Sequence, residues 1–399
     1  MSNLANRLLL SASTLLLAAG LEAQPPGGLP VISGNGFVYA MVAPNGGVKV
    51  WGRSKPKLGF GDGNTAAEVV WDDPRPVPGL GPAMSVSVGP GQALVLLADG
   101  TVAGWGGNSD CEVGNGEPGR KMRRGMPLAA APAPVPVTGL RNAVQVAAGS
   151  GVSGAVLADG SVWVWGAPDK GLLANGLEGG GYPCVAVPQP VEGLTGVVQL
   201  AFSETHALAL KQDGTIMAWG ANREGQIGDG TREPRFRPVQ VQGISNAISV
   251  GAGYYMSAAL LKDGTVRTWG MNLNGRMGDP STNPPDEAQR YKTTPYAVPG
   301  VTGVRALQAN SGFVLIQGPD GTLRGWGESY HGSLGIGVLD NFFGRPQAVK
   351  GLGPVARFYS MRQTVFAVRA DGAVFGWGPI QMNTAQGRVS TTGVPVRLF

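Results

Sequence analysis

Few side chains in this 399-residue chain could perform catalytic chemistry. His206 and His331 are its two histidines, and nucleophilic catalysis by a Ser-His-Asp arrangement needs a histidine beside the serine. Neither histidine lies next to a catalytic signature. The two cysteines, Cys111 and Cys184, together with the two histidines, do not supply a standard zinc cage. We therefore expect no catalytic residue, no metal and no cofactor.

Binding is the chemistry that the side chains do support. Tyrosine, tryptophan and arginine are common anchors of protein interfaces, and several of them lie in variable segments that we expect to be loops. Loops on a rigid scaffold commonly carry function, although an aromatic side chain can also simply pack against its own loop. The candidate partner-binding residues are Trp71, Glu204, Arg223, Phe236, Tyr254, Tyr255, Tyr330 and Arg362.

An internal repeat must position these segments. Seven copies of one segment follow each other at intervals of 50 to 60 residues, and periods of this size indicate a solenoid or a propeller. The copies begin at Asn45, Asp99, Asp159, Asp213, Asp263, Asp320 and Asp371, and each ends in Trp-Gly. To the tryptophans of these copies we assign a structural role: Trp51, Trp105, Trp165, Trp219, Trp269, Trp326 and Trp377.

Each copy predicts a β-hairpin. Asp-Gly between apolar runs is typical of a two-residue turn, because glycine tolerates positive φ and aspartate bonds its local backbone. A Pro-x-x-Val segment, such as PQPVEGL from Pro188, follows after a variable loop and precedes another short apolar strand. One repeat therefore contains four short strands. Six of the seven hairpins start with aspartate, so we interpret these acids as turn formers rather than as the carboxylate pair of a glycosidase.

The strand order at the two ends of the sequence predicts a closed ring. Three strands, around Val31, residues 37–41 and residues 48–51, precede the first Pro-x-x-Val segment, and the sequence ends with the similar segment VPVRLF. We expect the last strand to pair with the first three, which would remove open sheet edges. The predicted fold is an all-β, seven-bladed β-propeller of four-stranded blades over residues 30–399. An open β-solenoid is the alternative.

Composition agrees with this fold and narrows the partners. The 66 glycines and 31 prolines disfavour helices, and a hydrophobic content of 43% disfavours disorder. The net charge of +5 is small for this length, so we do not expect a nucleic-acid partner. A basic cluster at residues 120–124 keeps an anionic surface as an alternative to a solvated loop.

Residues 1–23 have the layout of a secretory signal peptide. Arg7 precedes an apolar run at residues 8–19, and Ala23 is a suitable last residue before cleavage. The run is short for a transmembrane helix, and we expect no transmembrane segment elsewhere. The sequence thus predicts a secreted or periplasmic protein. In such an oxidising compartment, Cys111 and Cys184, in loops of adjacent blades, could form a disulfide.

The repeat resembles that of the regulator of chromosome condensation family. The fourth copy, THALALKQDGTIMAWGANREGQIGDGT at residues 205–231, is nearest to the family pattern, and the resemblance extends over residues 30–399. It implies a seven-bladed propeller with one blade split between the ends of the chain. It also implies a histidine seven residues before the hairpin aspartate, which only His206 supplies. The family includes a nuclear nucleotide-exchange factor for a small GTPase and a plant ultraviolet-B photoreceptor. A secreted bacterial β-lactamase inhibitor is similar to this chain in fold.

The sequence favours a binding protein over an enzyme. In four-stranded antiparallel blades, the loop before each Asp-Gly hairpin and the loop after it lie on one face, here named the long-loop face. The tight Asp-Gly turns lie on the other face. We expect a secreted, monomeric, non-catalytic propeller that binds a protein through the long-loop face. The alternatives are an inhibitor of a secreted or periplasmic enzyme, a carbohydrate-binding or carbohydrate-acting propeller, and a guanine-nucleotide exchange factor.

Overall fold

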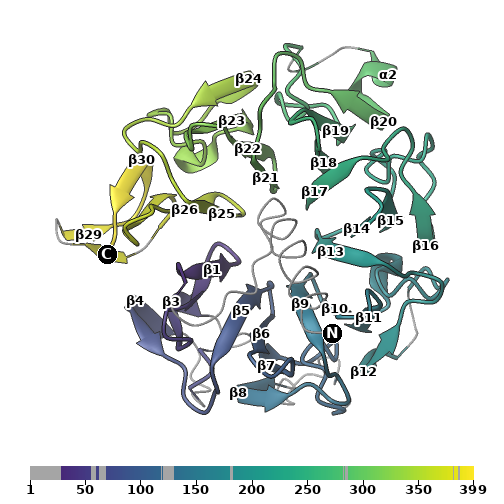
Figure 1. The fold of residues 1–399 in the computed structure, drawn as a ribbon, viewed down its shortest axis with the longest axis vertical. Coiled ribbons are helices and arrows are strands. Elements are labelled where there is room, and N and C mark those ends of the chain that lie inside the picture. Colours follow the sequence, from purple (N-terminus) through teal and green to yellow (C-terminus); the bar gives the residue numbers. More distant parts are fainter. Residues whose placement is uncertain are drawn as a thin grey trace, which may run out of the picture.

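The computed structural model describes residues 28–54, 60–62, 69–117, 119, 130–179, 183–281, 283, 286–380, 382–384 and 387–399. The predicted signal peptide and the basic cluster at residues 120–124 lie outside the described residues. In the part described, seven antiparallel sheets of four strands each stand as blades around a central axis (Figure 1). The predicted all-β seven-bladed propeller is confirmed.

Each blade runs outward from the axis in chain order. The innermost strands are β1 (Val31–Gly34), β5 (Ala83–Val88), β9 (Ala143–Ala148), β13 (Val197–Phe202), β17 (Ala247–Ala252), β21 (Ala306–Ala309) and β25 (Arg357–Met361). The second strands are β2 (Val38–Val42), β6 (Gln92–Leu97), β10 (Val152–Leu157), β14 (His206–Lys211), β18 (Met256–Leu261), β22 (Phe313–Gln317) and β26 (Thr364–Val368).

The third strands contain the repeated tryptophans near their ends, and the fourth strands form the rim. The third strands are β3 (Val48–Ser54), β7 (Val102–Gly107), β11 (Val162–Gly166), β15 (Ile216–Gly220), β19 (Val266–Met271), β23 (Leu323–Glu328) and β27 (Val374–Gly378). The outer strands are β4 (Val69–Pro76), β8 (Ala130–Pro136), β12 (Val185–Pro190), β16 (Arg235–Gln240), β20 (Tyr291–Ala297), β24 (Phe342–Ala348) and β30 (Thr392–Arg397). Small additions are the β28 (Met382–Thr384) and β29 (Gly387–Val389) hairpin, the 3₁₀ turns η1 (Asp169–Gly171) and η2 (Tyr330–Gly332), and α2 (Glu287–Arg290).

The predicted pairing of the last strand with the first three was wrong. β30 pairs with β27 of its own blade, with Gly376 opposite Val396, and β3 pairs with β4, with Val50 opposite Arg75. Each blade is therefore one contiguous segment. The reason is that every Pro-x-x-Val strand folds back onto the tryptophan strand that precedes it. Proline on these outer strands suits an edge, because it removes a backbone donor from the open side.

The ring closes where blade 7 packs against blade 1. The Tyr39 and Thr364 hydroxyls are 2.9 Å apart, and the Tyr359 hydroxyl donates to the Pro30 carbonyl at 3.0 Å. Side chains from both blades form one buried cluster, which includes Trp51 and Phe366. Closure thus relies on side-chain packing between complete blades rather than on a shared sheet.

The Asp-Gly turns form as the sequence predicts. At Asp99 the carboxylate accepts hydrogen bonds from the Thr101 amide at 2.9 Å and the Thr101 hydroxyl at 2.6 Å, while Gly100 has a φ of 77°. The Thr101 hydroxyl bond lowers the pKa of Asp99 below its ordinary value. The same geometry recurs at Asp159, Asp213, Asp263 and Asp320. These carboxylates are used by their own turns.

The repeated tryptophans lock neighbouring blades together. All seven are at most 1% exposed. Five donate their indole N–H to a backbone carbonyl in a loop of the preceding blade, as Trp219 does to Leu172 and Trp269 does to Gln226, both at 2.9 Å. Gly228 follows in that loop with a φ of 79°, and a Cβ there would lie 2.7 Å from the Trp269 Nε1. The repeated glycine is therefore required by the close approach of the indole.

Polar side chains also join the blades nearer the axis. The Gln145 amide donates to the Leu200 carbonyl and accepts from the Leu200 amide, both at 2.8 Å. His206 lies between Ser203, 2.8 Å from its Nδ1, and Ser257 of the next blade, 2.7 Å from its Nε2. The histidine is fully buried. It is thus a structural bridge, as the family pattern implies.

We expect His206 to make the fold acid-sensitive. Burial lowers the pKa of this imidazole from 6.5 to about 3, so the unfolded chain binds one more proton than the folded chain between these two values. Stability is therefore fully present above pH 6.5 and falls as the pH drops through that window. Between pH 7 and pH 5 the wild type should lose about 2 kcal/mol more than His206→Gln.

The measurement is urea unfolding of both proteins at the two pH values. Glutamine is the conservative replacement because Gln92 fills the same place in blade 2, where its amide donates to the Val152 carbonyl at 2.9 Å. Equal pH dependence in the two proteins would contradict a neutral, buried His206.

Candidate interaction site on the long-loop face

The two faces of the ring differ as the topology requires. Loops from the first to the second strand and from the third to the fourth strand of each blade lie on one face. A contact between Lys170, in the loop after β11, and Glu204, in the loop after β13, joins one loop of each kind. The Lys170 ammonium donates to the Glu204 carbonyl at 2.7 Å. The opposite face carries the tight turns whose aspartates are already bonded. Side-chain variety is therefore concentrated on the long-loop face.

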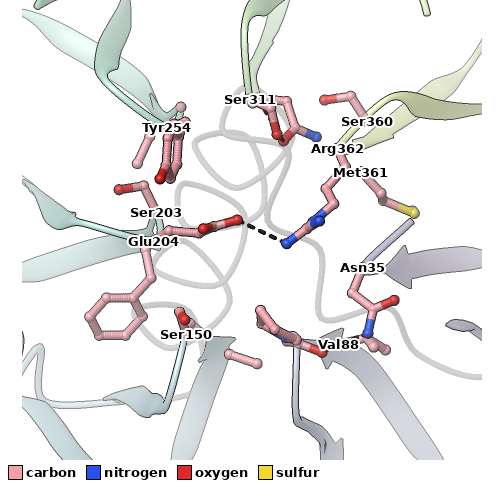
Figure 2. A pocket seen from close by; sticks show the side chains of 18 of the residues that line it. Asn35, Val88, Ser150, Ser203, Glu204, Tyr254, Ser311, Ser360, Met361 and Arg362 are labelled. Atoms are coloured by element: carbon pink, nitrogen blue, oxygen red, sulfur yellow. Dashed lines mark hydrogen bonds and ion pairs between the residues drawn. The ribbon is translucent and has the colours of Figure 1, made fainter. Parts of the chain in front are cut away.

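The mouth of the central channel opens at the centre of this face. A hollow of about 210 Å³ is lined by the first loop of all seven blades, including Asn35, Ser203 and Ser311 (Figure 2). Below it, a channel of about 300 Å³ runs between the innermost strands. The sequence provides this hollow because small residues, such as Gly89 and Gly149, occupy most of the first loops.

An ion pair spans the mouth. The Arg362 guanidinium from blade 7 lies 3.0 Å from the Glu204 carboxylate of blade 4 (Figure 2). Their side chains are 43% and 36% exposed, and exposed pairs of this kind contribute at most about 1 kcal/mol. Both groups are therefore accessible to a partner at small energetic cost.

A larger hollow of about 490 Å³ lies beside the mouth. Arg362, Glu204 and Tyr254 form its side toward the channel. The lining also includes Phe37 and Arg53 of blade 1 and His331 of blade 6. The hollow thus combines basic and aromatic side chains, which is a chemistry suited to recognition.

The repeat and the ring agree with what is found in known proteins. Residues 47–397 match the model of the RCC1-like domain. The chain belongs to the RCC1-like domain family. The solved structures that resemble it include yeast RCC1 (Prp20) bound to Kap60, with a TM-score of 0.70, 22% identity, and coverage of 93% of this chain and 83% of that one. Human WBSCR16 gives a TM-score of 0.74 at 21% identity, over 88% of this chain and 94% of that one. These likenesses show the fold.

Curated relatives share part of the propeller. Human HERC2, an E3 ubiquitin-protein ligase, is 31% identical over 215 residues, which is 52% of this chain and 4% of HERC2. The ultraviolet-B receptor UVR8 of Arabidopsis thaliana is 28% identical over 178 residues, 43% of this chain and 36% of UVR8. The RCC1-like chain therefore spans only a small part of HERC2 and about a third of UVR8.

The structure brings three of the predicted binding residues together in this RCC1-like propeller. Glu204, Tyr254 and Arg362 meet at the mouth. Tyr255 lies beside them, with its ring centroid 4.0 Å from that of Tyr254. The hydrogen bond between the two hydroxyls, followed by partial burial, raises the pKa of Tyr255 to about 12. Tyr330 is 41% exposed in η2.

Three other predicted anchors lie elsewhere. Trp71 is only 9% exposed and stacks on Phe60 at 4.1 Å between ring centroids, so the expectation of an exposed anchor there was wrong. Trp71 belongs to the outer strand β4 rather than to the loop before it. Phe236 is half-buried in β16 and packs over Gly171 of the adjacent blade. Arg223 is exposed in the loop after β15, outside the residues that line the hollows.

Sequence reasoning missed two residues of the site. Phe37 is 49% exposed, and Arg53 is exposed near the end of the tryptophan strand β3 of blade 1. His331, which lies next to no catalytic signature, is exposed and also lines the hollow. The repeat could have indicated Phe37, because it directly precedes the second strand of its blade as Tyr255 does.

The two cysteines of the RCC1-like chain join neighbouring loops. Cys111 and Cys184 form a disulfide, with an S–S distance of 2.01 Å and 5.7 Å between their Cα atoms. It connects the loop after β7 to the segment before β12, on the long-loop face. Among the described residues, no cluster of three or more His, Cys, Asp or Glu is placed to hold a metal ion. No helix in that same part of the chain has the length and hydropathy to cross a membrane.

Proposed function

We propose that this RCC1-like chain is an exported, non-catalytic propeller that binds a protein partner through its long-loop face. The observation that carries the proposal is the gathering of Glu204, Tyr254 and Arg362, from three different blades, around one accessible mouth. Further support comes from yeast RCC1, which is solved as a complex with the protein Kap60. An inhibitor of an exported enzyme is a narrower form of the same proposal.

Export is the second half of the proposal. It rests on the signal-peptide layout of residues 1–23 and is supported by the Cys111–Cys184 disulfide, because such bonds persist in oxidising compartments.

The experiment isolates the protein from the periplasm or medium of its native cells and compares capture of its partner by surface variants. Intact mass first reports whether residues 1–23 have been removed. A variant with Phe37, Tyr254 and Tyr330 changed to alanine should retain less than about a tenth of the partner, because large aromatic anchors dominate interface energy.

The matched control places its changes on the opposite face. A variant with Arg141, Gln212 and Lys262 changed to alanine removes three exposed side chains near the tight turns and should retain the partner as the wild type does. Equal loss in both variants, or loss only in the control, would overturn the assignment to the long-loop face.

A further inference from the structure

Arg362 is held over the mouth by an unusual backbone conformation. It lies in a two-residue turn between Met361 and Thr364, which are paired, and it has a φ of 51°. Glycine occupies that region of φ in the first loops of two other blades, at Gly36 and Gly151. A side chain there costs conformational energy, and such positions concentrate at functional sites.

Blade 1 leaves room for this arginine. A Cβ on Gly36 would lie 3.2 Å from the Arg362 Cδ, so the absence of a side chain at Gly36 lets the Arg362 stem pass. The turn and the glycine come from different blades, and both direct the guanidinium toward the hollow. Position and conformation thus independently favour a role for Arg362 in recognition.

Positive side chains outnumber negative ones around the larger hollow. Among its lining residues, Arg53 and Arg362 are positive and Glu204 is the single acid. The Glu204 carboxylate is bound to Arg362, and its backbone carbonyl accepts from Lys170. His331 adds an imidazole, while the nearby Asp340 carboxylate accepts from the His331 amide at 2.9 Å. A partner that brings a carboxylate would meet complementary charge.

The blade 6 loop that carries His331 into the hollow also exposes apolar side chains. Phe37 in the hollow is 49% exposed, and Tyr330 and Leu339 in the loop after β23 are 41% and 50% exposed. That loop is held by hydrogen bonds from the Gly332 amide to the Leu339 carbonyl at 2.6 Å and from the Ser329 amide to the Asn341 carbonyl at 2.7 Å. The loop that brings His331 to the hollow therefore presents exposed apolar side chains on a hydrogen-bonded backbone.

We infer that the larger hollow binds an exposed protein segment in which a carboxylate side chain stands next to a large apolar one. The carboxylate takes the place of Glu204 on the Arg362 guanidinium, and the apolar side chain packs on Phe37 and the blade 6 loop. This inference rests on the proposed protein-binding function and names the chemistry of the partner. Arg362 is therefore ion-paired both in the free protein, with Glu204, and in the complex, with the carboxylate of the partner.

The test selects binders from a random dodecapeptide library displayed on phage, using the wild-type propeller as target. Selected peptides are expected to contain Asp or Glu beside Leu, Phe, Tyr or Trp. A synthetic copy of a selected peptide is then measured by fluorescence anisotropy. Changing its acid to the corresponding amide should weaken binding about tenfold, as expected for the loss of a charge pair at an interface.

Two variants at the ion pair should change affinity in opposite directions. Arg362→Gln should weaken the binding of the acidic peptide about tenfold. Glu204→Gln should strengthen its binding about threefold, because the competing internal carboxylate is gone. A purely structural role of the ion pair would weaken binding in both variants. Arg141→Gln, on the opposite face, is the matched control for a lost positive charge and should have no effect.

The outcomes separate this inference from the proposed function. Selected peptides that bind Arg362→Gln as tightly as wild type but lose affinity for Tyr254→Ala would overturn the carboxylate site and leave the long-loop face intact. Selected peptides that contain no acidic residue would also overturn the carboxylate site and leave the long-loop face intact. Failure to select any peptide above the background of an unrelated protein would count against both.

Discussion

Replacing Trp219 with alanine is expected to lower the free energy of unfolding by about 3–5 kcal/mol, the range for removing a fully buried tryptophan. The indole is 0% exposed, and its N–H donates to the Leu172 carbonyl of the preceding blade at 2.9 Å. It packs in a cluster with Leu172 and Ala207, which belong to two different blades. The change therefore removes packing and leaves a buried carbonyl without its donor.

Two matched variants separate these effects. Trp219→Phe keeps most of the apolar contact and loses the hydrogen bond, so it should cost about 1–3 kcal/mol. Trp163 is outside the repeated position and only half-buried in β11. Trp163→Ala should therefore lower the free energy of unfolding clearly less than Trp219→Ala does. The measurement is urea unfolding followed by tryptophan fluorescence and circular dichroism. Similar losses for Trp219→Ala and Trp163→Ala would contradict the locking role of the repeat.

Loss of the disulfide is the second large effect. Cys111 and Cys184 are separated by 73 residues, and closing a loop of that size in the unfolded chain corresponds to a stabilisation of about 4 kcal/mol. The double variant with both cysteines changed to serine should lose about that much in guanidinium unfolding. A reductant should destabilise the wild type similarly and leave the double variant unchanged.

A thiol assay provides the control. Unreduced protein isolated from its native cells should show no free thiol. Two titratable thiols per chain, or a double variant as stable as the wild type, would show that the bond does not contribute in the natural protein.

The sequence allowed the blades to be predicted, because local rules form them. The Asp-Gly turns need only an aspartate, a glycine and a following hydroxyl, as at Asp99 and Thr101. The tryptophan positions followed from the repeat register. The pairing of β30 was different, because Pro-x-x-Val residues do not specify which neighbouring strand receives their backbone hydrogen bonds. A return to the preceding strand is the more local solution, and sequential strands usually pair.

The binding site could be predicted only in part, because it depends on the ring. Glu204 and Arg362 are 158 residues apart, and only the closure of seven blades brings them together. Tyr254 and Tyr255 were recognisable as aromatic residues in a first loop. Trp71 looked equally exposed, yet it is covered by Phe60, which comes from a loop whose packing no local pattern specifies.

Hydrogen exchange of the propeller with and without its captured partner tests the central claim most directly. Binding through the long-loop face predicts slowed exchange in the first loops at residues 203–206, 253–256 and 361–364, and in the blade 6 loop at residues 329–341. The tight turns at residues 98–101, 212–215 and 262–265 should be unchanged. Protection confined to those turns, with free exchange around Glu204 and Arg362, would contradict the account.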